Sequence, residues 1–224
     1  LNQTLFERIK AIFKNREAEN LSVEELTLLE KEYKGFVRNG ALLNDHEKDI
    51  LREIDKEKAQ LSLSFGENVL ADSQSFELHI TEESELKGLP DQVKEMAIET
   101  AKSNKKEGWV FTLDYPSYIP IMTYAENRKL RQKMSKAFGR RGFQDNDQNN
   151  ITIILRLIEL RKKRAGLLGY ESHAAFVLEE RMATSECNVK SFLEDLYKKT
   201  YPAARIEWEE MEKFASETLG LSVL

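Results

Sequence analysis

The chain has 224 residues, of which 41% are hydrophobic and 33% are charged, and 34 basic against 39 acidic residues give a net charge of −5. This length can bury a substantial core as one large domain or two small ones. The mild acidity argues against a dedicated nucleic-acid-binding protein, and no apolar run reaches the roughly 18 residues that a membrane-spanning helix needs.

The single cysteine, Cys187, excludes an intrachain disulfide and favours a reducing compartment. We therefore expect a cytoplasmic protein, or a periplasmic one if a signal peptide precedes the chain, with no membrane and no nucleic-acid partner. The chain opens on Leu1 rather than Met and closes on an apolar segment, Gly220 to Leu224, so we expect a fragment of a longer protein.

Residues 1–72 predict a helical hairpin. Ser22-Val-Glu-Glu25 fits a capping box, in which the Ser hydroxyl and the Glu carboxylate accept hydrogen bonds from each other's backbone amides. Asn44-Asp-His-Glu47 repeats this pattern at the start of a longer helix. Because a short turn separates these two helices, we expect them to pack antiparallel.

Residues 73–121 predict a β-containing insert followed by an extended connector. Phe76 to Ile80 alternates apolar and polar residues, and Trp109 to Leu113 is rich in strand-forming residues, with one helix between them. Tyr115 to Pro120 holds two of the four prolines, each of which disfavours helix at the preceding residue. These signals indicate a minor two-stranded β element and not a parallel α/β domain.

Residues 122–224 predict helices. Gly139 to Asn150 is rich in Gly, Asn and Asp and indicates a loop, and Gly169 suits a left-handed position after the helix that starts at Ile151. The last helix is expected to direct Trp208, Met211 and Phe214 inward. The predicted fold class is mainly α and multi-helical, with antiparallel helix pairs and a minor two-stranded β element, and residues 1–224 form a single helical fragment.

The three histidines do not form a predicted metal site. His46 is followed by Glu47, but the zinc-peptidase pattern His-Glu-x-x-His needs a second histidine where this chain has Ile50. We interpret His46 as a surface residue, His79 as an exposed strand residue, and His173 as a packing or capping residue of a first helical turn.

The other candidate groups also favour structural interpretations. Cys187 has no histidine base near it in the sequence, which favours a buried or idle thiol over a nucleophile. No glycine-rich phosphate loop occurs, and the basic runs Arg161-Lys-Lys-Arg164 and Gly139-Arg-Arg-Gly142 favour a solvated face over anion binding. We assign no catalytic, cofactor-binding or metal-binding residue to this chain.

Several spaced motifs occur in a fixed order along most of the chain. They are Leu61-Ser-Leu-Ser-Phe65, Asn68, Gly88-Leu-Pro90, Leu113 to Met122, Asn127 to Arg131, Asp147, Asn149-Asn150, Ile158 to Arg161, Ala165 to Tyr170 and Met182-Ala-Thr184. This order resembles the region upstream of the catalytic site in the thimet oligopeptidase and dipeptidyl carboxypeptidase family of zinc metallopeptidases. The resemblance is closest to the bacterial dipeptidyl carboxypeptidase branch.

The resemblance implies a non-catalytic, N-terminal-side part of a zinc oligopeptidase. In that family a His-Glu-x-x-His helix and a further glutamate bind zinc far toward the C-terminus, and these residues have no counterpart here. The expected partners are the remaining C-terminal catalytic part and short peptides, which zinc-activated water cleaves in a channel that this region walls on one side. The chain alone is expected to be inactive and to expose apolar surface around Leu219 to Leu224.

The sequence leaves one alternative open, a free-standing helical binding or regulatory protein that kept the peptidase scaffold without its catalytic half. A His-Glu-x-x-His motif downstream in the reading frame favours the fragment, whereas a stop codon favours the free-standing protein.

Overall fold

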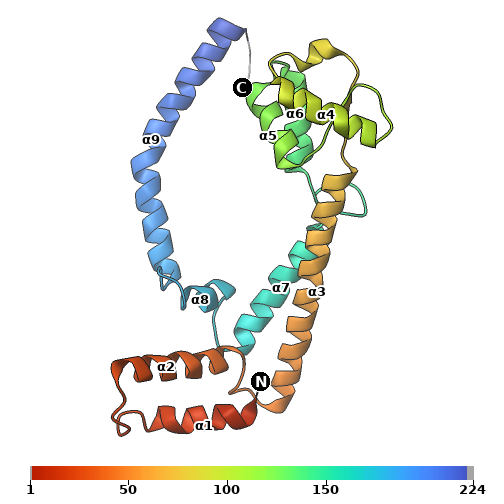
Figure 1. The fold of residues 1–224 in the computed structure, drawn as a ribbon. Coiled ribbons are helices and arrows are strands. Elements are labelled where there is room, and N and C mark those ends of the chain that lie inside the picture. Colours follow the sequence, from red (N-terminus) through yellow and green to blue (C-terminus); the bar gives the residue numbers. More distant parts are fainter. Residues whose placement is uncertain (1, 221–224) are drawn as a thin grey trace. The chain divides into compact units, whose positions relative to one another are not determined.

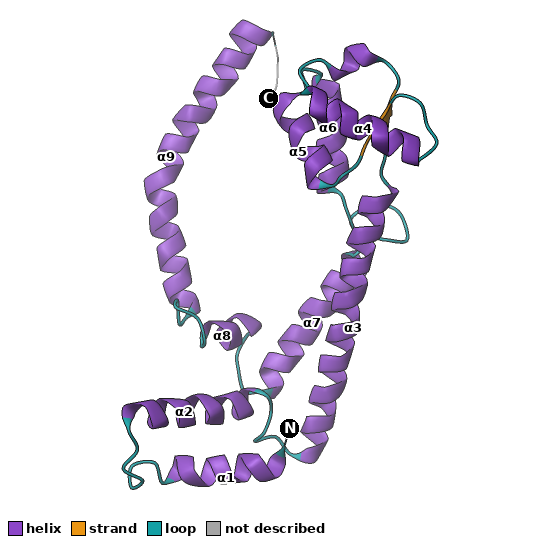
Figure 2. Ribbon diagram, viewed as in Figure 1, coloured by secondary structure: helices purple, strands orange, loops and turns teal. Residues whose placement is uncertain are grey.

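A computed structural model describes residues 2–220, and within them nine α-helices accompany one two-stranded antiparallel sheet, which confirms the mainly α fold class (Figures 1 and 2). In chain order the elements are α1 (Gln3–Lys14), α2 (Val23–Arg38), α3 (Asp45–Ser75), β1 (Leu78–Ile80), the 3₁₀ helix η1 (Glu83–Leu86), α4 (Asp91–Ser103), β2 (Trp109–Phe111), α5 (Tyr115–Tyr124), α6 (Arg128–Gly139), α7 (Ile151–Leu167), α8 (His173–Leu178) and α9 (Glu186–Leu219).

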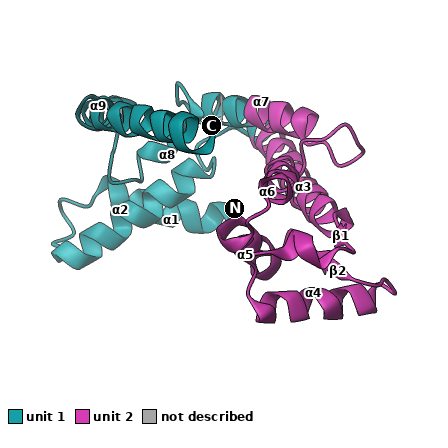
Figure 3. Cartoon of the chain, turned by 90° about the horizontal axis from the view of Figure 1, so that it is seen from above, with its two compact units in different colours: residues 1–47, 161–224 teal, residues 48–160 magenta. Residues whose placement is uncertain are grey.

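The chain divides into two compact units, coloured separately in Figure 3. The first contains residues 1–47 and 161–224, and the second contains residues 48–160. The second unit is therefore one continuous segment, whereas the first is assembled from both ends of the sequence.

In the first unit, α1 and α2 form an antiparallel pair held by aromatic contacts (Figure 1). The rings of Phe13 and Tyr33 stack with their centroids 3.9 Å apart. The ring centroid of Phe6, which is 1% exposed, lies 5.6 Å from that of Phe36. The sequence predicted an antiparallel pair of α2 with α3, and α3 belongs mainly to the other unit. The predicted capping box is confirmed, since Ser22 and Glu25 accept from each other's backbone amides.

In the second unit, the sheet and three helices enclose the main core. β1 and β2 pair antiparallel with Leu78 opposite Phe111, and η1, α4, α5, α6 and the adjoining loops supply the remaining buried side chains. Leu86, Ile121 and Met134 are fully buried among them. The two-stranded β element is thus present where the sequence predicted it.

The predicted extended connector at Tyr115 to Pro120 is wrong, because this segment begins helix α5. Pro116 is the second helical residue, where its missing N–H would have no intrahelical partner. Pro120 lies inside the helix and removes one backbone hydrogen bond. Burial of Ile121 and stacking of Tyr118 on Phe138, with centroids 4.1 Å apart, offset that loss.

The loop that follows α6 is held on α3 by a buried polar cluster. Asp72 is 2% exposed and accepts hydrogen bonds from the Gly142 amide at 2.6 Å and from the Asn146 side chain at 2.8 Å. Asn150 is 1% exposed and binds the Asn68 side chain at 2.9 Å. The loop predicted at residues 139–150 is therefore present from residue 140 and is fixed by side chains about 70 residues earlier in the chain.

Helix α7 ends as the sequence predicted. Gly169 has a φ of +85°, a left-handed conformation that suits glycine. The amide of Tyr170 donates to Ala165 O at 2.9 Å and that of Gly169 donates to Gly166 O at 3.1 Å, which is the pattern of a Schellman cap. This turn leads directly to α8.

Candidate functional site

The histidines lie where the sequence placed them, and none belongs to a metal-binding group. His46 is exposed in the first turn of α3, and His79 is exposed on β1, where a ring nitrogen lies 2.6 Å from Glu107 O. His173 is half-buried at the start of α8 and stacks on Phe176. Within residues 2–220 no group of three or more His, Cys, Asp or Glu side chains could hold a metal ion, so these residues do not fit a zinc site.

The remaining candidates for site chemistry also lie apart. Cys187 is exposed in the first turn of α9, so its thiol is not buried. Arg161 is exposed on α7, whereas the Arg164 guanidinium lies 5.0 Å from the Phe176 ring centroid. Arg141 likewise covers the Phe138 ring at 3.6 Å. One arginine of each basic run therefore has a packing role.

A cluster around Arg38 fixes the turn between α7 and α8 to the N-terminal hairpin. Arg38 donates to Phe176 O at 2.8 Å, pairs with Glu179, and covers the Phe176 ring at 4.0 Å. Tyr170 donates from its hydroxyl to Glu179 at 2.7 Å. The Arg38 side chain is only 13% exposed, so this is a partly buried, charge-assisted contact between segments more than 130 residues apart.

Electrostatics within this cluster follow from the same contacts. Burial, with a smaller contribution from the hydrogen bond to Glu179, raises the pKa of the Tyr170 hydroxyl above its ordinary value. The salt bridge between Lys34 and Glu180, at 2.5 Å, raises the pKa of the lysine and lowers the pKa of the carboxyl. Both shifts favour the charged pair that connects α2 to the end of α8.

Helix α9 presents a long exposed apolar face. Trp208, Met211 and Phe214, which the sequence predicted to point inward, are 43%, 51% and 59% exposed. At 100° per residue, these three side chains and six further exposed apolar side chains all lie on one half of the helical circumference. The six are Phe192, Leu193, Leu196, Tyr197, Tyr201 and Leu219.

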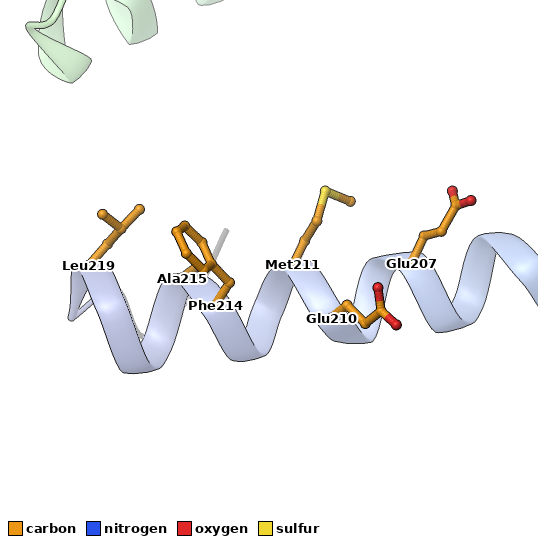
Figure 4. A pocket seen from close by; sticks show the side chains of 6 residues that line it. All are labelled: Glu207, Glu210, Met211, Phe214, Ala215 and Leu219. Carbon is orange, nitrogen blue, oxygen red and sulfur yellow. The ribbon is translucent and has the colours of Figure 1, made fainter.

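The inward prediction failed because a helical pattern identifies an apolar face but not the element that covers it. Near its C-terminal end α9 carries an open apolar hollow lined by Glu207, Glu210, Met211, Phe214, Ala215 and Leu219 (Figure 4). Met211, Ala215 and Leu219 follow one another along one side of the helix there. The expected exposed surface at Leu219 is confirmed, and residues 221–224 lie outside the described residues.

A second hollow, of about 230 Å³, lies in the second unit beside β2. Its apolar wall includes Val93, Ala97 and Phe111, and its rim includes Asp114 and Ser117. Ser117 accepts from the Thr112 amide at 2.9 Å, so its hydroxyl oxygen is already used to hold the start of α5. The sequence did not indicate this hollow, because its walls come from three separate elements.

Comparison with known proteins relates these elements to a peptidase family. Residues 121–224, which include α6, α7, α8 and α9, match the family model of peptidase family M3. This part of the chain is similar to peptidase family M3. The family resemblance predicted from the sequence is therefore confirmed.

Relatives with curated names extend the similarity over nearly the whole chain. An organellar oligopeptidase A of Arabidopsis thaliana is 33% identical over 96% of this chain and 28% of its own length. Oligopeptidase A of Haemophilus influenzae is 29% identical over 98% of this chain and 33% of its own length. Dipeptidyl carboxypeptidase of Escherichia coli is 29% identical over 92% of this chain and 30% of its own length.

The chain thus spans about 30% of the length of these M3 relatives. Their similar identities do not single out the dipeptidyl carboxypeptidase branch that the sequence favoured. Both the α9 face and the turn at Gly169 and Tyr170 lie inside the M3 match. No helix within residues 2–220 combines the length and hydropathy that a membrane span needs.

Proposed function

We propose that this chain is the non-catalytic, N-terminal-side part of a zinc-dependent oligopeptidase and forms one wall of the channel that admits short peptides. The observation that carries the proposal is similarity to M3 peptidases over nearly the whole chain, combined with coverage of only about 30% of their length. The partner of this chain is then the C-terminal catalytic part of the same polypeptide, and the compartment is the cytoplasm.

The exposed face of α9 supports a role as a wall. Burying a large apolar side chain contributes about 1.5–3 kcal/mol, and contiguous exposed apolar surface marks a place of contact with a partner or a ligand. Trp208, Met211 and Phe214 form such a surface inside the family match. A channel for peptides needs apolar surface of this kind together with few specific polar groups.

The zinc chemistry of the proposed enzyme comes from outside these 224 residues. The sequence has three histidines, none of them four residues from another, so no His-Glu-x-x-His motif occurs in it. The role of the described residues is to bind and orient peptide chains and to restrict access to the reacting centre.

Two measurements test the proposal. The 224-residue chain, assayed with a quenched-fluorescent peptide and added zinc, should give no turnover, and turnover abolished by a chelator would overturn the assignment as non-catalytic. In the full-length polypeptide, Met211→Gln with Phe214→Gln should lower kcat/KM for short peptides. Glu209→Gln with Lys213→Gln, on the charged side of α9, is the matched control.

The wall role fails if the apolar and control variants of the full-length protein have equal kcat/KM. It also fails if the full-length polypeptide has no peptidase activity toward short peptides. That result would favour the alternative, a helical binding or regulatory protein.

A further inference from the structure

Helix α6 carries a stripe of positive charge in a chain whose net charge is negative. Residues 128–141 contain seven Lys or Arg and no Asp or Glu, whereas the whole sequence has a net charge of −5. Four of the seven follow one another at spacings of four, three and four residues, which keeps them within about 60° on one side of a helix. The α6 stripe consists of Lys129, Lys133, Lys136 and Arg140, the last being the C-cap residue, and all four are exposed.

Two other basic residues of this segment, Arg131 and Arg141, have structural partners, which separates them from the stripe. Arg131 donates to Glu126 O at 3.1 Å and to Ala125 O, and Arg141 donates to Phe138 O at 2.9 Å. In contrast, within residues 2–220 none of the four stripe residues has a carboxylate at ion-pair distance. Their charge is therefore not neutralised by the fold.

The helix packed against α6 adds no negative charge beside the stripe. An adjacent face of α6 is anchored in the core by Leu130 and Met134, which are 3% and 0% exposed, so α6 has a fixed orientation. Helix α5, which packs against α6, has no charged residue from Tyr115 to Tyr124. A partner that approaches the stripe meets four cations and no neighbouring carboxylate from α5.

The dimensions of the stripe fit an extended acidic peptide. Eleven residue steps from Lys129 to Arg140 span about 16 Å at 1.5 Å per residue, which equals about five residues of extended chain at 3.3 Å per residue. Along the helix axis the cations are separated by about 4.5–6 Å. Side chains on one side of an extended peptide repeat about every 6.6 Å, so about three acidic residues at alternate positions face the four cations over this length.

Two other polyanion partners fit the stripe less well. An amphipathic helix that lies on an anionic membrane needs exposed apolar side chains next to its cations, and the apolar residues Leu130 and Met134 of α6 are buried in the core. A nucleic-acid interface usually extends over a basic face of a domain, whereas here four cations occupy one helix of an acidic chain.

We propose that the α6 stripe is a binding surface for extended peptides with acidic residues at alternate positions. The proposal deepens the proposed function, on which it rests, because it names acidic peptides as a favoured substrate class of the oligopeptidase. The stripe acts by attraction at the surface and takes no part in bond cleavage, so it raises the local concentration of such peptides.

Binding to the 224-residue chain tests the surface directly. A fluorescein-labelled hexapeptide of alternating Glu and Ala, titrated by fluorescence anisotropy at low ionic strength, should bind at least about 10-fold more tightly than the same peptide with Gln in place of Glu. Raising the salt concentration to about 0.15 M should weaken the binding of the Glu peptide and leave the binding of the Gln peptide unchanged.

A matched pair of variants locates the site. Changing Lys129, Lys133, Lys136 and Arg140 to Gln should abolish the preference for the Glu peptide. Changing four other exposed lysines, which are Lys102, Lys105, Lys198 and Lys213, removes the same total charge and should keep the preference. Circular dichroism of both variants establishes that the fold is retained, which is expected because all eight side chains are exposed.

Each other outcome overturns the proposal. Equal binding of the Glu and Gln peptides, or equal loss in both quadruple variants, would show that the stripe is not a peptide site. Tighter binding of a single-stranded oligonucleotide or of phosphatidylserine vesicles than of the Glu peptide would assign the stripe to a different partner. Because no turnover is measured, this test can fail while the channel-wall role stands, and the reverse also holds.

Discussion

Replacing Asp72 by Asn should loosen the loop after α6 and destabilise the unit that contains it. The carboxylate is 2% exposed and accepts one hydrogen bond on each oxygen, from Gly142 N at 2.6 Å and from Asn146 Nδ2 at 2.8 Å. An amide has one oxygen and one NH₂ group, so one of these two donors would face another donor.

The size of the effect follows from two opposing contributions. Losing a hydrogen bond to a charged group costs about 1.5–3 kcal/mol, and the unpaired buried donor adds about 1–3 kcal/mol. Removing a buried charge relieves part of the desolvation of Asp72, which acts in the opposite direction. We therefore expect a loss of about 2–3 kcal/mol, and at about 1–3 kcal/mol per molar urea this lowers the unfolding midpoint by about 1 M or more.

Urea unfolding followed by circular dichroism measures the stability, and hydrogen exchange of the Gly142 amide reports the loop. Asp49→Asn on the same helix is the matched control, because that side chain is 67% exposed and its ion pair with Arg52 lies in the solvent, where such a pair is worth at most about 1 kcal/mol. If Asp72→Asn costs less than about 0.5 kcal/mol, or leaves Gly142 exchange unchanged, the loop is not held by this carboxylate.

Three further substitutions test other contacts. Gly142→Ala should lower the free energy of unfolding by about 1–3 kcal/mol, because φ is +68° there and a Cβ would lie 2.6 Å from Asn150 Nδ2. Thermal unfolding measures this, and an unchanged Tm would contradict it. Arg38→Gln should lower the urea midpoint even in high salt, because the guanidinium is mostly buried against its partners; loss of the effect in salt would indicate a surface ion pair. Lys34→Gln should raise the pKa of Glu180 toward its ordinary value in an NMR titration. Since that pKa is lowered in the folded protein, the pair stabilises the fold above the unfolded pKa of the carboxyl and ceases to do so as the pH falls through the folded value.

Local signals in the sequence predicted the helix ends well. The capping box at Ser22 and the glycine that ends α7 at Gly169 depend only on residues within one turn of the backbone, so their sequence is sufficient to predict them. The strands at Leu78 and Trp109 were predicted for a similar reason, since alternation and strand-forming residues are local properties.

Contacts between distant segments could not be predicted in this way. Asp72 binds Gly142, and Arg38 binds the carbonyl of Phe176, yet nothing near Asp72 or Arg38 in the sequence marks a partner 70 or 138 residues away. Helix α5 illustrates the same limit, because burial of Ile121 outweighs the local preference of two prolines against helix. The sequence thus predicted elements more reliably than the packing that selects among them.

The two surfaces on which function is proposed differ in how the sequence encodes them. The apolar face of α9 is predicted by helical periodicity, but periodicity alone implies that the face is buried. It becomes a candidate contact surface because Trp208 and Phe214 are exposed in the structure. A search for contiguous basic runs finds Arg140 but not the α6 stripe, because Lys129, Lys133 and Lys136 are spaced three and four residues apart. Both surfaces emerge when residue spacing, burial and partner groups are considered together, since charge and apolarity indicate binding only where the fold leaves them unpaired.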